Sequence, residues 1–163
     1  MSYLGNYGVS AASVVKLFAF SLRSAPTADL VAVGAAYLDG GGSRAQLLNV
    51  LYNASIPQSP FANYASISTD TAFVTSLLDN LAYGATLASG AKTTWAGIIT
   101  PLLSEFPTRG DFVMALTGFF ETNASPDPDL IAMKALLAGR AETAAAFAQS
   151  PAGAVYTGLG FDQ

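Results

Sequence analysis

Apolar side chains recur along almost the whole chain at the spacing of an α-helix, and this periodicity constrains the fold more than any other feature. The clearest run contains Trp95, Ile98, Ile99, Leu102, Leu103 and Phe106, at positions i, i+3, i+4, i+7, i+8 and i+11. Such spacing places the apolar residues on one face of a helix that packs against a core. Pro101 lies inside this run, so we expect a kink or a break there. Similar runs begin near residues 14, 30, 73, 112 and 130, and no segment shows convincing strand alternation. The sequence therefore predicts an all-α fold, a multi-helix bundle.

Capping residues predict where several of these helices begin. Ser43 is followed three residues later by Gln46, a capping box in which each side chain bonds the backbone N–H of the other residue. Thr108 and Asp111 have the same spacing. Two further starts combine a capping side chain with a proline at the first helical position: Asp127-Pro128 and Ser150-Pro151.

A weak internal repeat divides the predicted helices into two units. The pattern Ser43-Arg44-x-x-Leu47-Leu48 matches Thr108-Arg109-x-x-Phe112-Val113, 65 residues further along the chain. Helical repeats stack so that each unit covers the apolar face of its neighbour. We therefore expect one two-lobed helical domain over residues 1–163. Its lobes cover about 10–53 and 69–122, with a surface loop at 53–68 and C-terminal helices over 127–158.

The composition removes several classes of function. The net charge is −4, and the seven cations are scattered singly, without the basic stripe typical of a nucleic-acid-binding protein. The chain has no histidine and no cysteine, so the commonest general base and the imidazole and thiolate metal ligands are missing. Glu105, Asp111 and Glu121 are the acids near the central helices, and neither spacing nor motif makes them a catalytic pair. We expect no nucleic-acid partner and a protein that is not an enzyme.

The chain also lacks membrane and leader signals. No run reaches about 18 apolar residues without a polar interruption, so no membrane span is expected. The first 22 residues lack a basic start, since their first cation is Lys16. Charged residues make up only 11% of the chain, which together with many small residues and no cysteine fits an exported protein. We expect an extracellular, cell-surface protein that is exported without a cleavable amino-terminal signal.

Two parts of residues 13–122 resemble a helical module common in secreted bacterial surface-layer and toxin-repeat proteins. The first part offers LRSAPTADL at 22–30, then Tyr37-Leu38 and Gly42-Ser43-Arg44; the second offers Leu81, Gly84, Trp95 and Thr108-Arg109. The first part lacks the tryptophan of the module, and the second lacks its Pro-Asp pair. The resemblance implies an all-helical, secreted module.

A second resemblance covers FFETN at 119–123 and DLIAMKALLAG at 129–139. These stretches look like the amino-terminal domain of the alphaproteobacterial surface-layer protein. This resemblance implies that the chain anchors to the O-antigen of lipopolysaccharide, or to another surface glycan, and forms a homo-oligomer or lattice. The glycine-aspartate calcium repeats found downstream in such proteins are absent here.

The aromatic residues of the predicted loop are the candidate glycan site. Tyr52, Phe61 and Tyr64 could stack on sugar rings, with Asn53 and Asn63 as hydrogen-bonding neighbours. The alternative is a loop whose aromatic side chains simply pack inward. Trp95 could also stack on a sugar, but its place in the cleanest helical run favours the core.

Asp127 and Asp129 form the candidate metal site, because two carboxylates at one helix start suit calcium. Asp39 and Asp70, near other loops, could join them. Helix capping explains Asp127 and Asp129 without any metal, and the sequence favours that interpretation. Calcium is therefore a possible cofactor rather than a required one.

The leading hypothesis is a non-enzymatic surface-layer-like protein that anchors to outer-membrane polysaccharide and self-assembles. A small helical adaptor that binds a protein partner through an apolar groove is the alternative. A third class, a histidine-free enzyme such as a glycan hydrolase, lacks a supporting motif.

Overall fold

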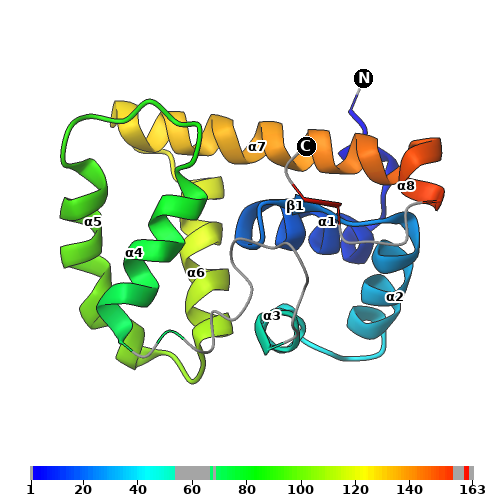
Figure 1. The fold of residues 1–163 in the computed structure, drawn as a ribbon, viewed down its shortest axis with the longest axis horizontal. Coiled ribbons are helices and arrows are strands. Elements are labelled where there is room, and N and C mark those ends of the chain that lie inside the picture. The colour runs from blue at the N-terminus through cyan, green and yellow to red at the C-terminus, as the bar shows by residue number, and fades with distance from the viewer. Residues whose placement is uncertain (1, 54–66, 68, 156–159, 162–163) are drawn as a thin grey trace.

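The computed structural model describes residues 2–53, 67, 69–155 and 160–161, and these ranges are mostly helical (Figure 1). The α-helices are α1 (Val9–Ser21), α2 (Ala28–Asp39), α3 (Arg44–Asn53), α4 (Asp70–Leu81), α5 (Ala91–Ile99), α6 (Arg109–Thr122), α7 (Pro128–Ala148) and α8 (Pro151–Val155). The 3-10 helices are η1 (Leu4–Asn6) and η3 (Thr100–Glu105), and two short strands, β1 (Ser24–Ala25) and β2 (Gly160–Phe161), pair antiparallel. The predicted all-α class is confirmed. The predicted loop at 53–68 lies outside the described residues, apart from Asn53 and Ile67.

The helix starts follow the predicted capping chemistry. The Ser43 hydroxyl accepts the N–H of Gln46 at 3.1 Å, and the Gln46 side chain accepts the N–H of Ser43 at 2.9 Å. The Thr108 hydroxyl accepts the N–H of Asp111 at 3.2 Å. Helix α5 ends at Ile99, and Pro101 lies in the first turn of η3. The expected break is confirmed, because proline cannot donate the hydrogen bond that would continue an α-helix.

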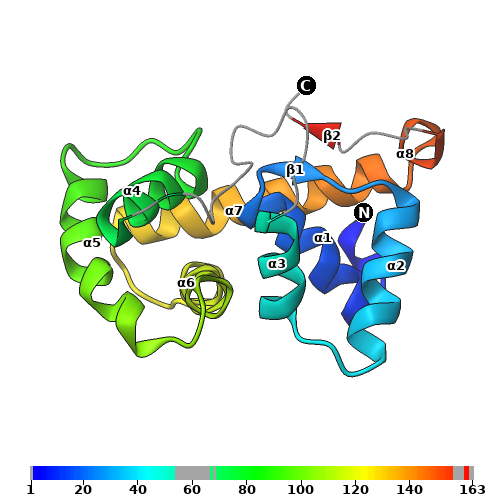
Figure 2. The ribbon, with the colours of Figure 1, turned by 60° about the horizontal axis from the view of Figure 1, so that its bottom comes forward.

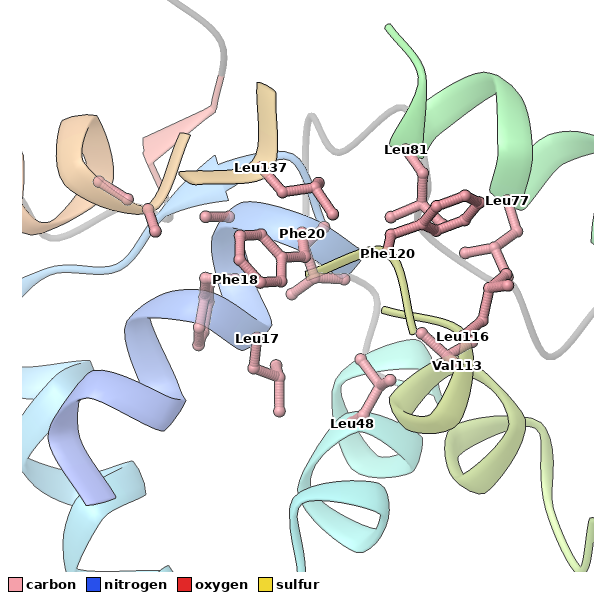
Figure 3. Packing of buried hydrophobic residues seen from close by; sticks show 14 of the residues in the cluster. Leu17, Phe18, Phe20, Leu48, Leu77, Leu81, Val113, Leu116, Phe120 and Leu137 are labelled. Carbon is pink, nitrogen blue, oxygen red and sulfur yellow. The ribbon is translucent and has the colours of Figure 1, made fainter. Parts of the chain in front are cut away.

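Helix α7 runs along one side of the molecule and contacts both ends of it (Figures 1 and 2). Helices α4, α5 and α6 lie toward one end, and α1, α2 and α3 lie toward the other. One buried apolar cluster runs through both groups. Figure 3 shows Phe20 of α1 and Leu137 of α7 near Leu81 of α4 and Phe120 of α6. The internal repeat between the two groups stays a prediction.

Helix α1 approaches α2 closely because the contact is made through a glycine. Gly34 of α2 is buried against Val14, and a Cβ at Gly34 would lie 2.8 Å from a Val14 methyl carbon. A side chain at this position would push α1 and α2 apart. The glycine in the predicted apolar run of α2 therefore has a packing role.

A second close approach joins the two groups of helices where α3 meets the start of α6. The Asn49 side chain donates to the Thr108 hydroxyl at 2.9 Å and accepts the N–H of Gly110 at 2.9 Å. A Cβ at Gly110 would stand 2.5 Å from the backbone carbonyl oxygen of Ala45. Because that oxygen belongs to the backbone of α3, it cannot rotate away. The contact fixes how the α4–α6 group sits against α3.

Helix α7 also holds the N-terminal segment. The Glu142 carboxylate accepts hydrogen bonds from the Ser2 hydroxyl and from the N–H groups of Tyr3 and Leu4 at 2.5 to 3.2 Å. These hydrogen bonds hold the pKa of Glu142 below its ordinary value of 4.5, and the bond from the Ser2 hydroxyl has the largest effect. The Gln149 side chain adds a bond to the Tyr3 carbonyl at 2.6 Å. The first turn of the chain is thus tied to the last turns of α7.

Helix α7 has 21 residues but is not apolar throughout, since it carries charged residues such as Lys134 and Arg140. Of the helices in the described ranges, none is both long enough and apolar enough to cross a membrane.

The α3–α6 contact generates a testable prediction. Gly110→Ala forces a methyl group against the Ala45 carbonyl, so we expect a loss of about 1 to 3 kcal/mol in the free energy of unfolding. Gly97→Ala is the matched control, because a Cβ at Gly97 on α5 meets no atom within 4 Å. That control should be neutral or stabilising by up to about 1 kcal/mol. Urea unfolding checks both, and equal effects would contradict the predicted close contact.

Candidate functional site

An open apolar groove of about 470 Å³ lies between α5 and η3 on one side and α6 with the start of α7 on the other. Its lining residues are Trp95, Ile98, Ile99, Leu102, Phe106, Phe112, Ala115, Leu116, Phe119, Phe120 and Leu130. Every one of these side chains is apolar. The volume falls within the range of about 300 to 1,000 Å³ that is usual for binding pockets. This groove is the strongest candidate functional site in the described part of the chain.

Aromatic contacts shape the floor of the groove. Trp95 lies with its ring centroid 5.4 Å from that of Phe120, and Phe106 meets the edge of Phe112 at 5.6 Å. Phe112 and Phe120 are almost completely buried, so they belong to the core as well as to the groove. The break at Pro101 ends α5 and starts η3, which carries Leu102 toward the same groove. The floor is therefore held rigidly by the core beneath it.

The rim of the groove exposes large apolar side chains to solvent. Ile98 is 60% exposed, Phe119 is 53% exposed and Leu102 is 49% exposed. Exposed apolar side chains that surround a concave apolar floor are typical of a site that binds another apolar surface. No lining side chain other than the indole of Trp95 carries a hydrogen-bonding group. The groove suits an alkyl, aromatic or amphipathic-helix surface, and it does not suit a sugar, which needs several hydrogen-bond partners.

The sequence predicted Trp95 as a core residue, and the structure places it at the edge of the core. It is partly buried, packs on Phe120 and lines the groove. One feature of the sequence indicates that an apolar ring lies outside the core in this region: Phe119 and Phe120 are adjacent in α6. Neighbouring residues of a helix point about 100° apart, so both rings could not face the same core. Phe120 is buried, and Phe119 lies on the rim.

The predicted glycan residues are only partly described. Tyr52 was expected in a loop, and this expectation was wrong: the backbone of Tyr52, like that of Asn53, lies in the last turn of α3. The Ser43–Gln46 cap starts this helix, which ends at Asn53, the first residue of the predicted loop. Phe61, Asn63 and Tyr64 lie outside the described residues. The glycan site stays a prediction.

The predicted metal ligands have structural partners. The Asp127 side chain caps α7 by accepting the N–H of Asp129 at 2.8 Å, and Asp129 accepts the N–H of Ala88 at 2.8 Å. Asp39 accepts from the Ser10 hydroxyl, and Asp70 lies 3.6 Å from Arg109. Within the ranges described, no group of three or more acidic, histidine or cysteine residues is placed to hold a metal ion. Capping accounts for Asp127, and calcium stays a prediction.

The three acids considered for catalysis make separate contacts. Glu121 pairs with Lys16 of α1, and Asp111 accepts the Thr108 hydroxyl at 2.5 Å. Glu105 lies exposed on η3. The contacts of Glu121 and Asp111 are those of helix pairing and helix capping.

Comparison of the chain with protein-family models, with curated proteins and with solved structures found no match.

The contrast between Phe119 and Phe120 generates a prediction about stability. Phe120→Ala removes a buried ring, so we expect it to lower the free energy of unfolding by about 3 to 5 kcal/mol. Phe119→Ala removes a ring that is largely in solvent, so we expect a loss of about 1 kcal/mol or less. Chemical denaturation followed by circular dichroism measures both. A large loss for Phe119→Ala would mean that this ring is buried and that the groove is closed.

Proposed function

We propose that this chain is a non-enzymatic protein of the bacterial cell surface, of the surface-layer kind, and that it associates with other protein chains through the apolar groove. The observation that carries the proposal is the groove itself, with a rigid aromatic floor and an exposed apolar rim. Soluble proteins rarely leave such a patch uncovered unless it binds something. A protein surface is the partner that best matches a lining with almost no hydrogen-bonding groups.

The low content of charged residues supports association with other protein chains rather than a monomeric state. Charged residues make up 11% of the sequence, against a usual share of about 25%. Charged surfaces keep proteins apart and soluble, so a charge-poor surface favours contacts between chains. Apolar side chains on an open rim add to this tendency, because their burial releases about 25 cal/mol for each Å² removed from water.

Anchoring to lipopolysaccharide O-antigen, or to another surface glycan, is the second part of the proposal. It rests on the resemblance of residues 119–123 and 129–139 to the surface-layer anchoring domain. The groove does not suit a sugar, so the glycan would bind elsewhere, at Tyr52, Asn53, Phe61, Asn63 and Tyr64. Calcium at Asp127 and Asp129 belongs to this part of the proposal, in which the ion would support the glycan contact or the lattice contact. Export without a cleavable amino-terminal signal belongs to the same proposal.

The anchoring proposal predicts retention of the protein on isolated outer-membrane polysaccharide. The binding assay is run with calcium and, in parallel, with a chelator. Retention that the chelator abolishes would support a calcium-dependent site, and retention in both conditions would support one that needs no metal. Failure to bind in either condition would contradict anchoring and would leave the groove proposal intact.

The adaptor hypothesis shares the groove but differs in the partner. An adaptor holds one defined protein of a different sequence, whereas a surface-layer protein binds copies of itself. The groove favours an adaptor or a surface-layer protein over an enzyme. These two hypotheses differ in whether the purified protein associates with itself.

The groove proposal predicts self-association that depends on the rim. Phe119→Asp places a charge on the rim, so we expect it to prevent the rise in mass that sedimentation velocity detects as the wild-type concentration increases. Val9→Asp is the matched control, because Val9 is 87% exposed at the start of α1 and does not line the groove. The unfolding curves of both variants should stay close to that of the wild type. A wild type that stays monomeric at all concentrations, or a Phe119→Asp variant that still associates, would contradict self-association through this groove.

A further inference from the structure

We infer that Glu142 is an acid-sensitive latch that holds residues 2–7 on α7, and that its protonation loosens this segment while the helical body stays folded. Three donors converge on its carboxylate. The Ser2 hydroxyl donates to Oε1 at 2.5 Å, and the N–H groups of Tyr3 and Leu4 donate to Oε2 at 2.8 and 3.2 Å. These bonds join positions 138 to 140 residues apart in the sequence, so they decide where the segment lies.

The strength of the three bonds depends on the charge of the carboxyl group. An ionised carboxylate only accepts hydrogen bonds, and bonds to it are about twice as strong as bonds to a neutral acceptor. A proton on either oxygen turns that oxygen into a donor. Protonation of Glu142 therefore costs at least one of the three bonds as it stands and weakens the others.

The charged groups around Glu142 leave control of the latch to its own carboxyl group. Its neighbours one turn away on α7 are uncharged: Ala138, Gly139, Ala145 and Ala146. Of the other described elements that contact α7, η1, β1 and α8 carry no charged residue, and Lys16 of α1 pairs with Glu121 of α6. Arg140 of α7 bonds the carbonyl oxygens at the end of α4. The α-amino group of the chain adds a weaker attraction, and the tyrosines of the segment, Tyr3 and Tyr7, are neutral in acid.

The direction of the pH effect follows from the hydrogen bonds. The bond from the Ser2 hydroxyl lowers the pKa of Glu142 below 4.5 the most, and the backbone bonds lower it further. A carboxyl group whose pKa is lowered by a contact stabilises that contact fully above its ordinary pKa and loses the effect as the pH falls through the lowered pKa. The docking constant of the segment falls about tenfold for each pKa unit between the docked and the released state.

Gln149, one turn before α8, supplies the part of the contact that does not titrate. Its side chain donates to the Tyr3 carbonyl at 2.6 Å and accepts from the Asn6 side chain at 2.8 Å. Amide groups keep the same charge at all the pH values at which a carboxyl group titrates. Acid therefore loosens the segment by the contribution of Glu142 alone.

Release of the segment uncovers apolar surface. Leu4 and Tyr7 are partly buried and pack against the core cluster. The segment joins α1 through Gly8, which is exposed and makes no side-chain capping bond to that helix. The bonds within α1 do not depend on the segment, so loosening ends at Gly8 and leaves the helices in place.

Nuclear magnetic resonance tests the latch. As the wild type is titrated from neutral pH to about pH 3, the amide shifts of Tyr3 and Leu4 should follow the pKa of Glu142, and the heteronuclear Overhauser effect should show residues 2–6 becoming mobile over the same range. Glu142→Gln removes the charge at nearly constant size. Its segment should be mobile already at neutral pH, with no further change in acid. Glu105→Gln is the matched control, because Glu105 lies exposed on η3, which packs on α4 and α5.

A second variant separates the latch from a merely structural role of Glu142. Ser2→Ala keeps the carboxylate and removes the bond with the largest effect on its pKa, so the pKa of Glu142 should rise toward 4.5. An unchanged pKa in this variant would overturn the latch. So would a Glu142→Gln segment as rigid at neutral pH as that of Glu105→Gln, or a wild-type segment that stays rigid after Glu142 is protonated. Trp95 emission reports whether the helical body is folded, and if acid unfolds the wild type, the comparison of the two glutamine variants at neutral pH decides.

Discussion

The burial of α1 is the constraint on which the rest of the structure depends. The last half of this helix, from Val14 to Ser21, is almost completely buried, and α1 contacts α2, α3, α4, α6 and α7. A helical segment that is apolar on most of its sides is stable when other helices surround it, and burial of each large side chain contributes about 1.5 to 3 kcal/mol. Both groups of helices contact α1. Helix α5 packs mainly on α4 and η3 instead, so one wall of the α5–α6 space is left open.

Local chemistry made much of the fold predictable. The Ser43–Gln46 cap, the Thr108 cap and the break at Pro101 depend on residues within a few positions of each other, so the sequence shows them directly. The contacts between distant segments were not predictable in this way. Asn49 bonds the start of α6 across 61 residues of sequence, and neither residue type signals the pairing.

The groove was predictable only in part. The adjacent pair Phe119-Phe120 and the break in the Trp95 run both indicate that some apolar side chains face away from the core. Which of them face solvent depends on whether another helix covers the space between α5 and α6. That is a property of the packed structure, and no pattern within one helix contains it. The groove is therefore a consequence of how α5 and η3 pack beside α6 and the start of α7.

Trp95 offers the most direct measurement of whether the groove is a protein contact. It is the only tryptophan in the chain, and it lines the groove, so its fluorescence reports on that site alone. If copies of the chain dock there, the Trp95 emission maximum shifts to shorter wavelength as the wild-type concentration rises, in step with the sedimenting mass. A growing mass with an unchanged Trp95 emission would contradict the central claim, because the chains would then be meeting somewhere else.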